Sequence, residues 1–311
     1  MPFDHDNVVS AINASLFFDN NIFSDDYMNS LSSAHRDPGD GHMLISDSSP
    51  PSINIVNGRL EFGNKSPCID IGRLARLESL RQDHLNDAER FYEIASNLSV
   101  GFGSRVRRLA QILSLPLTEE SSFRIANQVQ GIKEIWTTLE NELTPASSAD
   151  IGSFVKSMID FSNQFPAWRE FLEDSEVRRP PVALEVQALK QLATVIQHQP
   201  SNLIADDLKS AVQEASEAGE NSSSARISYL QRLIHNTFFA AGHYIIERSK
   251  GAKTKFNDKI EKEIGEGLAS GLVNLILVAS TPLLALMMQL PAHFGWVGPA
   301  LAAARLLSSR K

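Results

Sequence analysis

Residues 227–245, ISYLQRLIHNTFFAAGHYI, carry the clearest helical pattern in this sequence. Their apolar members recur at steps of three and four: Ile227, Leu230, Ile234, Phe238, Ala241 and Ile245. Because an α-helix turns once every 3.6 residues, this spacing places them on one face, as in a helix packed on a core. The same spacing recurs through residues 74–249 and predicts about eight amphipathic helices there. Since the connections are short, we expect a mainly α multi-helix bundle.

Prolines, glycines and capping residues set the expected ends of these helices. We expect a first helix at 74–98, ended by the glycines at 101 and 103. Thr118 is expected to cap a later helix whose first turn is acidic. Pro166 opens a short helix, and Ser201 begins another.

The composition is that of a globular protein, and it excludes some classes of partner and binding site. It has 311 residues, 42 % of them hydrophobic and 21 % charged, which fits about two domains. The net charge is −8, and residues 1–73 hold ten acidic against four basic side chains. Since the rest is nearly neutral, there is no global basic footprint, and we expect no nucleic-acid partner. Cys68, the single cysteine, excludes an intramolecular disulfide and a multi-cysteine zinc site.

Residues 1–73 have a different texture and form the first of three expected regions. Short apolar runs separated by Asn, Asp, Gly and Ser indicate short strands with tight turns. Alternating apolar residues on either side of Asn57-Gly58 predict a hairpin at that turn. The acidic opening Met1-Pro2-Phe3-Asp4 has no basic, continuously apolar start, so we expect no signal peptide.

One motif in this region resembles a known family. Asn57-Gly58, seven residues, and then SPCIDIG at 66–72 resemble the closing coil of right-handed parallel β-helix repeat proteins. That coil typically reads Asn-Gly, a strand, and Ser-Pro-Ala-Ile-Asp-Ala-Gly, so Cys68 and Ile71 depart from it. The resemblance implies β-helix end coils, with Asp70 structural. The family includes polysaccharide lyases and hydrolases whose catalytic acids lie on upstream coils, so no catalytic residue is carried over. The alternative is an irregular acidic arm with one hairpin.

The C-terminal region, 250–311, contains the longest uncharged stretch. Residues 267–304 contain no Asp, Glu, Lys or Arg. A helix over 268–290 would be ~35 Å long, enough to cross a ~30 Å hydrocarbon layer, with a kink at Pro282. A second apolar stretch, 294–307, completes an apolar helical hairpin. The residues expected to insert into a bilayer are Leu272, Leu275, Ile276, Leu283, Leu284, Leu286 and Trp296. A hairpin buried in a helical core is the alternative.

Basic residues suggest where an anion or a lipid head group binds. Lys253 and Lys255 precede the apolar tail, and basic residues also follow it. Positive charge on both flanks favours a hairpin whose two ends stay on the cytoplasmic side of a membrane. Arg105, Arg107 and Arg108 form a second small basic cluster. Its alternative interpretation is a solvated helix face.

Signatures of catalysis are absent from the sequence. There is no phosphate-binding P-loop, Gly-x-Ser-x-Gly elbow or His-Glu-x-x-His. His243 and Glu247 are four residues apart and could offer two metal ligands, but a solvated or capped pair is favoured. The run Asp-His-Asp at positions 4–6 resembles a set of metal ligands only in its residue types. We therefore expect a non-enzyme with no cofactor and no metal.

Three functions fit these patterns. The first is a membrane-associated effector or anchor whose hairpin moves from a sheltered state into lipid, with pore formation as one form of this activity. Colicin-type pore formers have a similar arrangement of helices but share no motif with this chain. The second is a non-catalytic interaction module with the hairpin in its core, which binds a protein partner or a second copy of itself. The third is a fragment of a carbohydrate-active β-helix protein.

Overall fold

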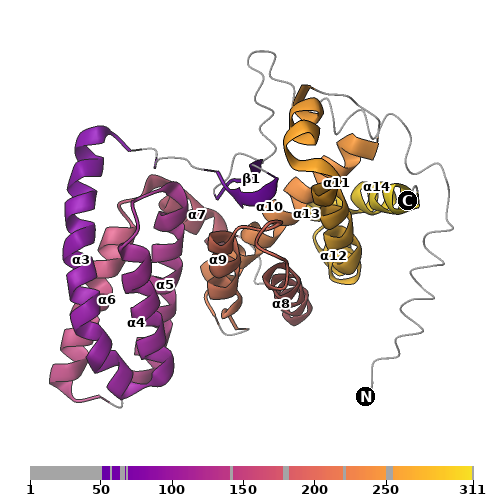
Figure 1. The fold of residues 1–311 in the computed structure, drawn as a ribbon. Helices are drawn as coiled ribbons and strands as arrows, with labels where there is room; N and C mark the ends of the chain where they lie inside the picture. Colours follow the sequence, from indigo (N-terminus) through magenta and orange to yellow (C-terminus); the bar gives the residue numbers. More distant parts are fainter. Residues whose placement is uncertain are drawn as a thin grey trace, which may run out of the picture. The chain divides into compact units, whose positions relative to one another are not determined.

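A computed structural model of the chain describes residues 51–56, 58–63, 67, 69–140, 143–177, 182–219, 222–249 and 255–309 (Figure 1). The side chains of residues 176–177 and 255–266 are outside this description. The described residues belong to one compact unit that spans 45–311. They are mainly helical, with one small antiparallel sheet, which confirms the predicted fold class at this level. The expected strands before residue 51 lie outside the described residues.

The predicted hairpin is present. Strand β1 (Ile53–Val56) pairs with β2 (Arg59–Phe62) in antiparallel register, and Gly58 takes the positive φ of 83° that this tight turn requires. Buried Leu60 fastens the hairpin to the helices, since its N–H donates to the Leu203 carbonyl at 2.8 Å and its carbonyl accepts from the Ala205 N–H at 2.9 Å.

This arrangement gives no support to parallel β-helix coils. The two strands run antiparallel, and the SPCIDIG motif leads directly into a helix. Within the motif, Asp70 is the N-cap of that helix and accepts a hydrogen bond from the Arg73 N–H at 2.9 Å. Asp70 is therefore structural, but as a helix cap.

Four helices follow, each in contact with its neighbour in sequence: α3 (Ile71–Leu98), α4 (Val100–Leu113), α5 (Glu119–Leu139) and α6 (Pro145–Ser162) (Figure 1). Thr118 caps α5 through a reciprocal capping box with Ser121, as predicted. The glycines at 101 and 103 do not end a helix. They lie inside α4, because Ser99 alone interrupts the chain and caps α4 by accepting from the Phe102 N–H.

The next four helices complete the body: α7 (Pro166–Val177), α8 (Ala183–Gln197), α9 (Asp206–Ser216) and α10 (Ser224–Ser249). Pro166 begins α7, as expected. The prediction that a helix begins at Ser201 was wrong, because residues 203–205 are paired with β2 and α9 starts only after them. All six residues of the apolar stripe in α10 are buried, which confirms that prediction.

The apolar tail is divided into α11 (Lys255–Val278), α12 (Ser280–Gln289), α13 (Pro291–Phe294) and α14 (Val297–Ser308). A single kinked helix over 268–290 was expected, but the chain breaks at Ala279 and bends by 60°. Pro282 explains the break, because it has no N–H to donate to the carbonyl of Val278 four residues earlier. Helix α14 packs on α10 and α11, and α12 packs on α8.

Candidate functional site

The tail residues expected to insert into a bilayer lie in the core. Leu272, Leu275, Ile276, Leu283 and Leu286 are fully buried, Trp296 is 8 % exposed, and Leu284 is half-buried. They share one hydrophobic core with α8 and α10. Among the described helices, none is by itself both long and apolar enough to span a membrane, although the bent pair 267–278 and 280–289 meets the criterion when taken together.

The contact between α10 and the tail is close and specific. A Cβ atom on Gly242 would lie 2.7 Å from the Trp296 ring and 3.1 Å from the Ala300 methyl, so glycine is needed there. His235 Nε2 lies 2.9 Å from the His293 carbonyl oxygen. The rings of Phe239, Phe294 and Trp296 surround this histidine. The tail is thus held by shape and by polar contacts as well as by apolar burial.

The expected anion-contacting residues do not form one surface. Arg105 turns inward, is 8 % exposed, and forms an ion pair with Glu217 at 3.1 Å. Burial, together with the like charge of Arg226, lowers the pKa of Arg105 to about 10. Arg108 pairs with the same carboxylate of Glu217. Lys253 lies outside the described residues, and Lys255 lies at the start of α11 with its side chain undescribed.

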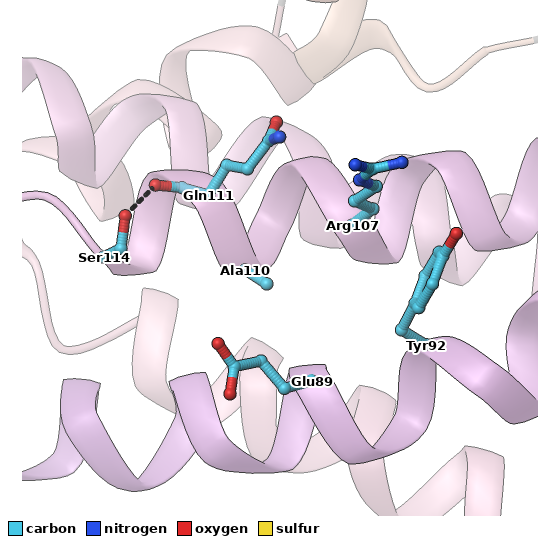
Figure 2. Close-up of a pocket in the computed structure, with 6 residues that line it drawn as sticks. All are labelled: Glu89, Tyr92, Arg107, Ala110, Gln111 and Ser114. Atoms are coloured by element: carbon cyan, nitrogen blue, oxygen red, sulfur yellow. Dashed lines mark hydrogen bonds between the residues drawn. The ribbon is translucent and has the colours of Figure 1, made fainter.

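Arg107 lines a hollow of about 470 Å³ to which α3 and α4 both contribute side chains (Figure 2). Its guanidinium lies 6.0 Å from the centre of the Tyr92 ring, and Glu89 lines the same hollow. The hollow is shallow, and the carboxylate and guanidinium on its two walls offset each other in charge. It offers contact for a polar surface, but no enclosed binding cavity.

A buried network of ion pairs on α5 was not predicted from the sequence. Arg124 donates to both carboxylate oxygens of Glu214, at 3.1 and 2.6 Å, and also pairs with Glu120. Although burial alone lowers the pKa of Arg124, its bonds to Glu214 outweigh that effect and raise it. Burial raises the pKa of Glu120. Arg124 and Glu214 are 90 residues apart in sequence, whereas Glu120 and Arg124 are four apart on one helix. The signal in the sequence was charged residues within otherwise apolar helix faces.

A second missed pair joins α5 to the start of α10. Glu134 accepts from the Ser223 N–H at 2.7 Å and from the Arg226 guanidinium. Burial by itself raises the pKa of Glu134, but these two donors outweigh it and hold the pKa below its usual value. Arg226 is 2 % exposed, so this carboxylate is a principal neutralising partner of a deeply buried cation.

Metal ligands are not assembled among the residues that the structure describes: no group of three His, Cys, Asp or Glu side chains is close enough to hold an ion. His243 and Glu247 lie one turn apart on α10. The Asp-His-Asp run at positions 4–6 lies outside the described part of the chain. Arginine–carboxylate networks are the buried charge clusters described above, and guanidinium groups suit structural pairing and anion binding.

Comparisons with protein-family models, curated proteins and solved structures found no match to this chain.

Proposed function

We propose that this chain is a non-catalytic helical interaction module in which the apolar C-terminal hairpin is part of the core. The supporting observation is the burial of the tail. Five of its large aliphatic side chains are fully buried, and α12 and α14 pack on α8 and α10. Burial of a leucine stabilises a fold by about 1.5–3 kcal/mol, so the body would lose much of its stability without the tail.

The close fit at Gly242 supplies the test. A Gly242→Val substitution places methyl groups where Trp296 and Ala300 now lie. Gly267→Val is the matched control, because a Cβ atom on Gly267 meets nothing within 4 Å. The full-length protein and both variants are compared by size exclusion with light scattering in detergent-free buffer, and by flotation with vesicles that contain anionic lipid.

For an interaction module, the unaltered protein is monodisperse without detergent and does not float. Overpacking by about 1–3 kcal/mol lowers the melting temperature of Gly242→Val by several degrees, at about 2–4 °C per kcal/mol, without adding flotation. Gly267→Val melts near the unaltered protein. Flotation of the unaltered protein would contradict the proposal.

A second candidate function, insertion of the tail into a bilayer after release, is favoured by one observation. Residues 267–278 and 280–289 together have the length and hydropathy of a bent membrane span. In this case the packed arrangement is the sheltered state, and only the free-energy difference between it and the lipid-inserted state drives the change. The same variants distinguish the two functions, since Gly242→Val would then float more than Gly267→Val.

A further inference from the structure

Two buried arginines meet beside Gly131 on α5. The Arg105 guanidinium lies directly against this glycine, where a Cβ atom would be 2.6 Å from Nη1 and 3.0 Å from Cζ. Arg226 approaches from α10 and pairs with Glu134, one turn further along α5. The two residues are only 8 % and 2 % exposed. Two guanidinium groups so deeply buried need more than one compensating partner each, because a buried unpaired charge is costly.

Several donors at this point have no hydrogen-bond partner among the described residues. They are Arg105 Nη1, Arg226 Nε and Nη2, and Ser223 Oγ. The amides of Asn127 and Gln128, one turn back along α5, are fully buried and also unpartnered. Because buried polar groups are nearly always hydrogen-bonded, the unpartnered guanidinium N–H groups indicate a missing acceptor, and the unpartnered amide oxygens of Asn127 and Gln128 indicate a missing donor.

Charge points to the same conclusion. Arg105, Arg108 and Arg226 contribute three positive charges, whereas the carboxylates paired with them are Glu134 and Glu217. Glu217 is shared between Arg105 and Arg108. Within the described residues the cluster thus has one positive charge more than its paired carboxylates neutralise. An anion would restore neutrality.

A surface hollow lies next to the cluster. A surface hollow of about 510 Å³ is lined by Glu134, Ser222 and Ser223, among others. Two of these residues are direct partners of Arg226, because Glu134 pairs with its guanidinium and Ser222 Oγ accepts from it at 3.1 Å. The hollow therefore borders the Glu134 carboxylate and the Ser222 hydroxyl, the two groups that hold Arg226 Nη1.

We propose that Arg105, Arg226 and Ser223 bind the phosphate group of a small soluble molecule that enters through this hollow. Guanidinium forks match a tetrahedral oxyanion, whose oxygens accept several hydrogen bonds at once, better than they match a single-atom anion. The start of the long helix α10 lies at the same point, and a helix N-terminus favours negative charge. The depth of both arginines selects a small ligand over a membrane surface.

Inorganic phosphate is the probe for the test. The full-length protein is titrated with phosphate at constant ionic strength, with chloride as the reference anion, and the melting temperature and the heat of binding are measured. Binding predicts a saturable rise in melting temperature. Arg105→Gln should weaken the apparent Kd at least tenfold, which corresponds to the loss of one charged hydrogen bond of about 1.5–3 kcal/mol. Arg169 is exposed, so Arg169→Gln is the matched control and should bind phosphate as the unaltered protein does.

Arg105→Gln risks a folding defect, so Ser223→Ala provides a second test at the mouth of the site. The loss of one hydroxyl donor should weaken the apparent Kd by about fivefold without disturbing the core. Two outcomes overturn the proposal. One is a phosphate response in the unaltered protein no larger than that of chloride, which would mean that water satisfies these donors. The other is an equal phosphate affinity in Arg105→Gln, Ser223→Ala and Arg169→Gln.

Discussion

Arg124 and Glu214 are each 8 % exposed at the side chain and are joined by two hydrogen bonds. In a buried ion pair of this kind, the attraction between the two charges offsets the hydration that both have lost. The net contribution of the ion pair to stability therefore differs from the stability lost when one partner is removed. A comparison of single and double substitutions separates these two quantities.

We expect Arg124→Met to reduce the free energy of unfolding by about 3–5 kcal/mol, because Glu214 is then left buried without its main partner. The double substitution Arg124→Met with Glu214→Leu should cost much less, since no uncompensated charge remains. Urea unfolding of the two single variants and the double variant measures the coupling. Additive losses would show that the pair is not coupled.

His84 is a buried titratable group that packs against Phe161, with ring centroids 4.8 Å apart. Burial lowers the pKa of His84 below its usual 6.5, although Asp87 and Asp83 oppose the shift. The unfolded chain therefore binds a proton more readily than the folded chain does. It follows that stability decreases as the pH falls through 6.5, and that the contribution of this residue is fully present only above that pH.

His84→Leu should remove this part of the pH dependence. We expect the unaltered protein to lose more stability than the variant between pH 7.5 and 5.5, because the variant has no imidazole to protonate. Chemical unfolding at the two pH values, with each protein referred to itself, gives the comparison. Equal losses in both proteins would rule out His84 as a source of the pH dependence.

At the scale of the elements, α3 and α4 are joined by a single residue and packed closely along their length. The two helices approach closely at Gly103, where a Cβ atom would lie 2.3 Å from Ser96 Oγ and 2.7 Å from its Cα. A side chain there must push the two helices apart, because the second neighbour is backbone. Gly101, two residues earlier in the same helix, faces open space.

These two glycines make a matched pair. Gly103→Ala should reduce the free energy of unfolding by about 1–3 kcal/mol through overpacking. Gly101→Ala should raise it by about 0.4–1 kcal/mol, since it lowers the entropy of the unfolded chain without a clash. Thermal and urea unfolding of both variants test this opposite sign. Destabilisation of equal size in both would refute the close-approach explanation.

Periodicity, capping residues and prolines predicted the elements whose causes are local. The stripe in α10, the cap at Thr118 and the start of α7 at Pro166 all depend on residues within one or two helical turns. The false helix start at Ser201 had a distant cause, because the chain there pairs with β2. The pairs Arg124–Glu214 and Arg226–Glu134 were missed for the same reason, since about 90 residues separate their members.

At the scale of the whole molecule, the fate of the apolar tail could not be decided from composition. A lipid bilayer and a protein core both select Leu, Ile, Val and Ala, so the pattern at 267–304 fits either environment. The body supplies the missing information. Gly242 leaves room for Trp296, and α8 offers a surface to α12.

If the tail and the body form one core, they should unfold together. Leu283 in α12 is fully buried, and Leu283→Ala should therefore reduce the stability of the whole unit by about 2–5 kcal/mol. Met288→Ala, in the same helix and 79 % exposed, is the control and should change stability little.

Trp296 reports on the tail and Trp168 on the body. Fluorescence is followed in the Trp296→Phe background, which keeps Trp136 and Trp168 of the body, and in the Trp136→Phe, Trp168→Phe background, which keeps Trp296 of the tail. The two backgrounds should give coincident transitions, both shifted by Leu283→Ala. A separate, earlier transition of the tail would instead identify it as an element that can leave the core, as bilayer insertion requires.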